Sequence, residues 1–188
     1  MSQRPGPSGQ FSVRAARPTD LPAMKELFDQ LDELQRDWRV FRPRAGIREE
    51  YLAEYEQAMG RDGAAMFVAE EGGAGSRVVG MCYAHEVIPS GHSNDRAVEL
   101  SSVVVAGTSR HRGIGRALVE AGARFAEARG IDRLTIRVFA ANPALGFWEA
   151  IGFSPRFVQL TARPSDLLGG LGGPADAGSS NDRGPMQE

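Results

Sequence analysis

The sequence predicts an α/β domain in which helices pack on one mixed β-sheet. Strand-like runs, rich in β-branched or alternating apolar residues, recur at residues 65–70, 77–88 and 98–105. Segments with apolar residues at helical spacing separate or follow them, the clearest over residues 114–129. The 188 residues suffice for one domain, and 41% hydrophobic with 24% charged residues is a globular balance.

The N-terminal third is predicted to form one strand and two helices. Residues 1–10 are rich in Pro, Gly, Ser and Gln, and we expect a flexible arm there. Apolar residues alternate over residues 11–17, which favours an edge strand. A helix capped by Thr19 or Asp20 follows, and a second helix covers residues 48–59.

The C-terminal part continues with shorter elements. The helix over residues 114–129 ends at Gly130, a residue type that favours the left-handed conformation after a helix. A strand over residues 134–138, a short helix over 142–151 and a last strand over 156–162 follow. Beyond them Gly, Pro, Ser and Asp dominate. We therefore expect an N-terminal arm at residues 1–10, a folded domain at 11–163 and a disordered tail at 164–188.

Charge and cysteine content argue against several classes of protein. A formal net charge of −2 argues against a nucleic-acid binder that relies on bulk charge. Cys82 is the single cysteine, so no intrachain disulfide can form and no cysteine-based metal site is expected. No apolar run reaches the length of a membrane span, and the first residues lack the apolar core of a secretory signal. We expect no membrane partner, no metal and a cytoplasmic location.

The junction between the strand at 98–105 and the helix that follows has the chemistry of an anion site. A helix start exposes unpaired backbone N–H groups and the positive end of the helix dipole. Gly113 and Gly115 let a phosphate approach that backbone closely. Arg110, Arg112 and Arg116 add positive charge and paired donors. The alternative is an ordinary helix start with solvated arginines.

Two motifs resemble the GNAT superfamily of acyl-CoA-dependent N-acetyltransferases. The junction has neither the Gly-Lys-Ser/Thr of a nucleotide P-loop nor a full dinucleotide fingerprint, but residues 110–115 match that family's Arg-x-x-Gly-x-Gly after a strand. Residues 142–153 (NPALGFWEAIGF) resemble its Asn-x-x-Ala-x-x-Phe-Tyr-x-x-x-Gly-Phe motif. The resemblance covers residues 11–162 and implies a mixed, mostly antiparallel central sheet flanked by helices, the GNAT-like fold.

The resemblance further implies that acetyl-CoA binds as co-substrate where two neighbouring parallel strands splay apart. Its pantetheine arm would pair with strand backbone beside a bulge at Ser101–Ser102, and its pyrophosphate would lie on the glycine loop. The residues so implied in cofactor binding are Val103, Val104, Val105, Arg110, His111, Arg112, Gly113, Ile114, Gly115, Arg116, Asn142 and Trp148.

Glu99 is the expected general base. It lies 14 residues before Gly113 (113 − 99), where family members with an acidic base on this strand carry it. A base is needed because an alkyl amine, with a pKa of about 10.4, is protonated at neutral pH. Two alternatives remain for Glu99: an exposed strand glutamate without a role, or a residue that only binds substrate.

Two positions depart from the family motif. Trp148 stands where the family has a tyrosine that is often the general acid for the leaving thiolate, and an indole cannot supply that proton. Either the thiolate leaves unprotonated or another group, such as Tyr83 or Ser154, serves. The step from Asn142 to Ala144 is also one residue shorter than in the family.

The sequence thus predicts an N-acetyltransferase that moves an acetyl group from acetyl-CoA to a primary amine by direct transfer in a ternary complex. The acceptor is a small molecule or a peptide amine, including protein lysines or N-termini. An alternative is an inactive acyl-CoA-binding regulatory module, for which Trp148 is the main support. A homodimer is left open.

Overall fold

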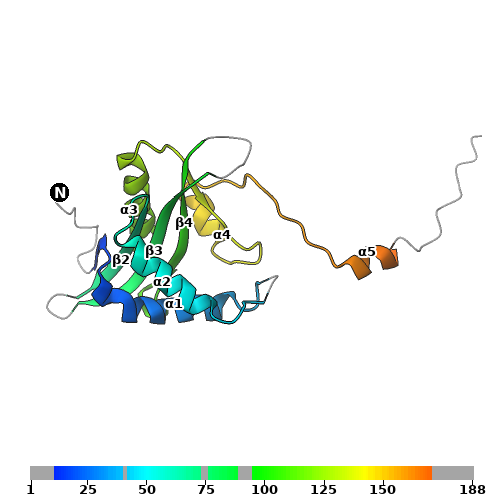
Figure 1. Cartoon of the computed structure of the whole chain (residues 1–188), viewed down its shortest axis with the longest axis horizontal. Helices are drawn as coiled ribbons and strands as arrows, with labels where there is room; N and C mark the ends of the chain where they lie inside the picture. The colour runs from blue at the N-terminus through cyan, green and yellow to red at the C-terminus, as the bar shows by residue number, and fades with distance from the viewer. Residues whose placement is uncertain (1–10, 40–41, 73–75, 89–94, 171–188) are drawn as a thin grey trace, which may run out of the picture. The chain divides into compact units, whose positions relative to one another are not determined.

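A five-stranded sheet in the order β1-β2-β3-β4-β5 forms the centre of the part of the chain up to Phe153 (Figure 1). The strands are β1 Phe11–Ala15, β2 Ala64–Glu71, β3 Arg77–Val87, β4 Ala97–Val105 and β5 Leu134–Ile136. Neighbouring strands are antiparallel except β4 and β5, which are parallel. The predicted mixed, mostly antiparallel sheet is therefore confirmed.

This computed structural model describes residues 11–39, 42–72, 76–88 and 95–170. They fall into two units, divided between Phe153 and Ser154, and each is described by itself. The predicted arm at residues 1–10 and the tail beyond residue 170 lie outside the described residues. The helices are η1 Pro18–Asp20, α1 Leu21–Gln35, α2 Ile47–Ala58, η2 Gly107–Ser109, α3 Ile114–Ala128, α4 Leu145–Ala150 and α5 Pro164–Gly170.

The sheet separates two apolar clusters because side chains alternate along each strand. On β3, Met81 and Tyr83 pack with residues of α1 and α2, including Met24. Cys82 and Ala84, which alternate with them along the strand, pack on the other face. The helix on that face is α3, whose apolar stripe includes Ile114, Leu118, Val119 and Ala126. Figure 1 shows α1 and α2 next to each other.

Helix α3 lies close to the sheet because glycines stand at the contact. A Cβ added to Gly122 would lie 2.6 Å from Cδ2 of Leu100, a fully buried side chain on β4. A Cβ added to Gly80 on β3 would lie 3.1 Å from Cδ1 of Leu118. Small residues at these positions let α3 dock on the strands that carry the candidate site.

The predicted strand over residues 156–162 is wrong. These residues have no regular secondary structure, and Phe157, Val158 and Leu160 are exposed. A strand pattern describes side chains, but a strand also requires a partner edge for its backbone groups. The first unit also ends at Phe153, ten residues before the predicted boundary at 163 (163 − 153), and α5 forms where the disordered tail was predicted to begin.

Candidate active site

Strands β4 and β5 separate shortly after they pair. Val98, Glu99 and Leu100 pair with Leu134, Thr135 and Ile136, and β5 ends there while β4 continues to Val105. Beyond Leu100, no described strand pairs with β4 on that side. Parallel strands that splay in this way leave backbone donors and acceptors of β4 open to a ligand.

A bulge in β4 lies at the same place. Between the pairs Met81↔Val104 and Tyr83↔Ser101, β3 has one residue and β4 has two, Ser102 and Val103. Ser102 has a left-handed backbone, with φ of 49°. The bulge is therefore centred one residue later than the predicted Ser101–Ser102.

Val103 in the bulge and the two valines after it divide between the two sides of β4. The backbone N–H of Ala106 donates to the Val79 carbonyl on the β3 side at 2.8 Å. Backbone groups alternate along a strand, so those of Val105 and Val103 point to the open side. Val104 pairs with Met81 instead. Backbone pairing with a ligand is therefore available from Val103 and Val105.

The loop into α3 presents its backbone as the sequence predicts. His111 and Gly113 both have left-handed backbones, with φ of 61° and 83°. Gly113 is the N-cap of α3, and no side chain caps the helix start. N–H groups at such a start attract anions. A Cβ added to Gly115 would lie 3.5 Å from Phe147 Cζ, so α4 also reaches this corner.

The three loop arginines have partners within the protein. Arg110 Nε donates to the Val105 carbonyl at 3.1 Å, on the open side of β4. Arg112 donates to Glu71 Oε1 at 2.9 Å, and Arg116 reaches Glu120 at 3.4 Å. Glu71 also accepts from Ser109 Oγ at 2.9 Å. The carboxylate at the end of β2 therefore holds the loop, a role that no local sequence signal indicated.

The second motif forms the start and body of α4. Asn142 Oδ1 accepts the N–H of Ala144 at 2.9 Å, so this side chain closes the turn before the helix. Trp148 is buried and packs edge-to-face on Phe147 and Phe153, with ring centroids 5.0 and 5.5 Å away. The structure therefore gives both residues internal packing or capping contacts.

Glu99 lies on the α1/α2 face of β4, beside the opening. It is 14% exposed, and Arg137 donates to its Oε1 at 2.9 Å. Arg137 is 87% exposed, and an ion pair with such an exposed partner is weak and easily exchanged. A cationic amine could therefore replace the guanidinium at the Glu99 carboxylate. Arg137 follows β5, and its contact with β4 had no signal in the sequence.

Tyrosines from two elements line the same face. The Tyr83 hydroxyl accepts from Arg61 at 2.7 Å and donates to Glu54 at 3.0 Å. Burial, with the Glu54 contact, raises the pKa of Tyr83 to about 12. The Tyr55 hydroxyl lies 2.5 Å from Ser102 Oγ at the bulge, and burial also raises its pKa. No sequence pattern marks Tyr55, on α2, as a residue of the site.

Cys82 is remote from this chemistry. It is fully buried among the residues that pack under α3, on the opposite face of β3 from Tyr83. Burial raises the pKa of its thiol to about 12, so the nucleophilic thiolate is scarce at neutral pH. This placement argues against an acyl-enzyme on Cys82.

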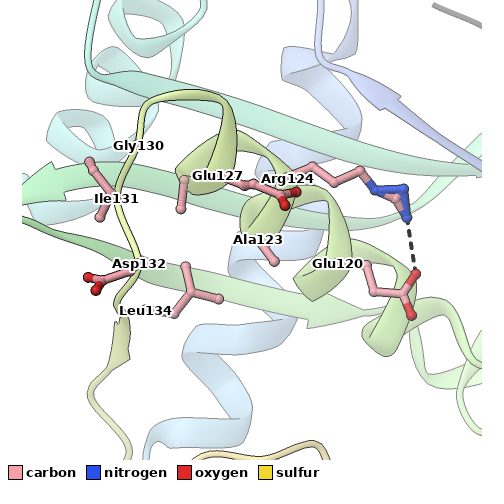
Figure 2. A pocket seen from close by; sticks show the side chains of 9 residues that line it. Glu120, Ala123, Arg124, Glu127, Gly130, Ile131, Asp132 and Leu134 are labelled. Carbon is pink, nitrogen blue, oxygen red and sulfur yellow. Dashed lines mark hydrogen bonds and ion pairs between the residues drawn. The ribbon is translucent and has the colours of Figure 1, made fainter.

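A separate hollow lies along the C-terminal half of α3 (Figure 2). Glu120, Arg124 and Glu127 of α3 and Ile131, Asp132 and Leu134 after it are among the residues that line the hollow. Figure 2 shows Arg124 paired with Glu120 at its edge. None of the predicted site residues lines it.

Within the described ranges, no group of three or more His, Cys, Asp or Glu side chains is arranged to hold a metal ion. In the same residues, no helix combines the length and apolar character needed to cross a membrane.

Comparisons with known proteins identify the family. Residues 28–153 match the model of the Acetyltransferase (GNAT) family, whereas no curated protein matches the sequence. Among solved structures, an acetyltransferase of Trypanosoma brucei is 20% identical with a TM-score of 0.58, and the match covers 81% of this chain and 99% of that one. Glucosamine-6-phosphate N-acetyltransferase of Arabidopsis thaliana is 19% identical with a TM-score of 0.60, over 81% and 97%.

A third structure, described as a predicted acetyltransferase of Clostridium acetobutylicum with acetyl-CoA, is 16% identical with a TM-score of 0.63, over 83% and 97%. At such identities these structures establish the fold alone. The family model, however, spans more than half of the chain, and the protein therefore belongs to the GNAT family of acetyltransferases.

Proposed function

We propose that this protein transfers an acetyl group from acetyl-CoA to a primary amine, directly and within a ternary complex. The main support is the open side of β4, which has the glycine-arginine loop at one end and Glu99 at the other. The loop suits a pyrophosphate and the carboxylate suits an ammonium group.

Val103 and Val105 offer backbone groups to the pantetheine arm, and residues 110–116 offer N–H groups and guanidinium groups to the pyrophosphate. The backbone at the bulge is the group we assign to polarising the thioester carbonyl. Asn142 and Trp148 support the corner from α4, through the turn and the packing described above.

Glu99 is the group we assign to taking a proton from the acceptor amine, directly or through water. The deprotonated nitrogen attacks the thioester carbon, the carbon–sulfur bond breaks, and CoA leaves as thiolate. Trp148 cannot protonate that thiolate. A second candidate function, an acyl-CoA-binding module without turnover, is favoured by this one feature: the buried indole in the tyrosine position.

The first test is thermal unfolding with and without acetyl-CoA, followed by a panel of small and peptide amines. At 100 times its Kd, a ligand of the folded state adds about 2.7 kcal/mol of stability, which raises Tm by several degrees. We expect that shift together with amine-dependent release of CoA thiol. A shift without turnover on any amine would favour the inactive module, and no shift at millimolar acetyl-CoA would refute both functions.

A further inference from the structure

His85 lies directly opposite Glu99 in the β3–β4 pairing. Directly opposed residues in an antiparallel pair have their Cβ atoms about 5 Å apart on the same face of the sheet. We propose that His85 is a second proton acceptor for the amine, working beside Glu99. This inference rests on the proposed function, since it concerns the same acceptor site.

One face of the His85 ring stacks on a neighbouring ring, and one of its nitrogens has no hydrogen-bond partner among the described residues. It stacks on Tyr83 with 4.7 Å between centroids and an interplanar angle of 17°. Tyr83 is itself fixed by Arg61 and Glu54 through its hydroxyl. His85 Nδ1 is buried and has no hydrogen-bond partner among the described residues. A buried polar atom without a partner is unusual, and a substrate N–H would satisfy it once the acceptor displaces the side chains that cover this nitrogen.

The surroundings keep the imidazole able to accept a proton. Burial lowers the pKa of His85 below its ordinary value of 6.5, so the ring is neutral at pH 7. The carboxylates of Glu99 and Glu54 oppose this shift, and the guanidinium groups of Arg61 and Arg137 add to it. The groups that face the ring thus come from β3, β4, α2, the segment after α2 and the segment after β5: Tyr83, Glu99, Glu54, Arg61 and Arg137.

The reaction removes two protons from the nitrogen, and we assign one to each of two acceptors. An alkylammonium ion has three N–H bonds and the secondary amide that it becomes has one. Two protons therefore leave the nitrogen, one before it attacks the thioester and one as the tetrahedral adduct expels CoA thiolate. Glu99 and His85 take one each. Overall, one proton ends on the thiolate and the other passes to solvent.

The test compares two amine probes that differ in how many protons they must lose. Butylamine is protonated at pH 7 and must lose two, whereas 2,2,2-trifluoroethylamine is largely neutral and must lose one. We expect His85→Gln to lower kcat/KM for butylamine by at least about tenfold, because proton transfer by a placed base contributes about 10²–10⁴-fold. For trifluoroethylamine the loss should be small, since Glu99 remains. The double variant with Glu99→Gln should lose both activities.

Two controls separate this effect from a structural one. Glu86→Gln changes the neighbouring residue on the opposite face of β3, which is in ion pairs with Arg96 and Arg129, so the ratio of the two activities should stay near that of wild type. His85→Gln should also keep the wild-type stabilisation by acetyl-CoA, because His85 lies opposite Glu99 on the strands and is not part of the loop at residues 110–116.

NMR titration of the histidine rings tests the same assignment without turnover. The chain has three histidines, and comparison with His85→Gln assigns the signal. The pKa of His85 should lie below 6.5. It should fall further in Glu99→Gln, which removes a negative charge, and rise in Arg137→Gln, which removes a positive one.

The proposal is overturned if His85→Gln keeps wild-type kcat/KM for both amines. Failure of the proposed function has a different signature. In that case the wild-type protein itself, and not only the variant, would transfer acetyl to no amine of the panel, these two probes included, and the proposal would fall with it.

Discussion

Glu99 is the side chain whose replacement most directly tests the chemistry. Glu99→Gln keeps the shape but removes the proton acceptor and its attraction for an ammonium group. We expect kcat to fall by about 10²-fold or more while acetyl-CoA affinity stays near normal. The loss should be greatest at low pH, where a larger fraction of the amine must be deprotonated on the enzyme.

Glu86 provides the matched control for this variant. It lies next to His85 on β3 but on the other face, in ion pairs with Arg96 and Arg129. Glu86→Gln should leave turnover unchanged. Equal turnover of Glu99→Gln and wild type across the pH range would remove Glu99 as base.

Gly113 is the residue that tests the cofactor loop. Gly113→Glu places bulk and negative charge where the pyrophosphate would lie, so acetyl-CoA should no longer raise Tm. Gly130→Glu is the control, since Gly130 also has positive φ, 67° against 83°, and open space beyond its Cα. Both variants suffer similar backbone strain, but only Gly130→Glu should still bind acetyl-CoA. Binding by both variants would contradict the loop assignment.

At the scale of elements, the contact between α3 and β4 can be tested with two helical glycines. Gly122→Ala, in the interior of α3, gains about 1 kcal/mol of helix propensity, and Gly146→Ala, near the start of the short helix α4, gains less. An added Cβ at Gly146 meets nothing within 4 Å, whereas at Gly122 it lies 2.6 Å from the Leu100 side chain. Overpacking of a core costs about 1–3 kcal/mol. Chemical denaturation should therefore show Gly146→Ala stabilised and Gly122→Ala destabilised.

A second substitution then checks the cause. Leu100→Val shortens the side chain that the new methyl group would strike. Its cost should be smaller in the Gly122→Ala background than in wild type. Additive costs would place the strain elsewhere.

Most elements were predictable because their signals are local. Alternation predicted β1 to β4 within two residues, and the spacing of Ile114, Leu118 and Phe125 predicted α3. β5 ends at Ile136 rather than 138, since its pairing with β4 stops at Leu100. The strand predicted over residues 156–162 failed because a strand needs a partner strand. These residues have a strand-like composition but pair with no strand.

The residues of the candidate site also fall into two groups: those with a local sequence signal and those without one. Glu99 and the loop glycines were found because a motif of fixed spacing joins them. The contacts of Tyr55 with Ser102, Arg137 with Glu99 and Glu71 with Ser109 each join segments more than 35 residues apart. No periodicity or short motif describes such pairs, so only the folded chain places them at the site.

At the scale of the molecule, an ion-pair network ties the first strand to the rest. Arg14 on β1 donates to Asp20 Oδ2 at 2.7 Å and pairs with Glu70 on β2 at 2.9 Å. Arg14 holds the pKa of Asp20 below its usual 3.8. The folded state thus binds fewer protons than the unfolded state as pH falls toward 3.8, so this stabilisation is present above that pH and is lost below it.

Asp20→Asn should therefore lower the free energy of unfolding at pH 7 by about 1–3 kcal/mol, because it removes hydrogen bonds to a charged group. Denaturation measured from pH 7 to pH 3 should show the difference from wild type shrinking as the pH drops below 4 or so. A difference that stays constant with pH would mean that the charge on Asp20 is not what stabilises this corner.

Cys82 is the only cysteine and is fully buried beneath α3. The rate at which its thiol reacts therefore reports how often the fold opens. A thiol reagent reaches it only when α3 lifts or the sheet comes apart, so the labelling rate counts such openings. Any small molecule that binds the loop at the start of α3 should slow that reaction in proportion to its occupancy. The Cys82 thiol is therefore a reporter with which ligands of this loop can be screened without an activity assay.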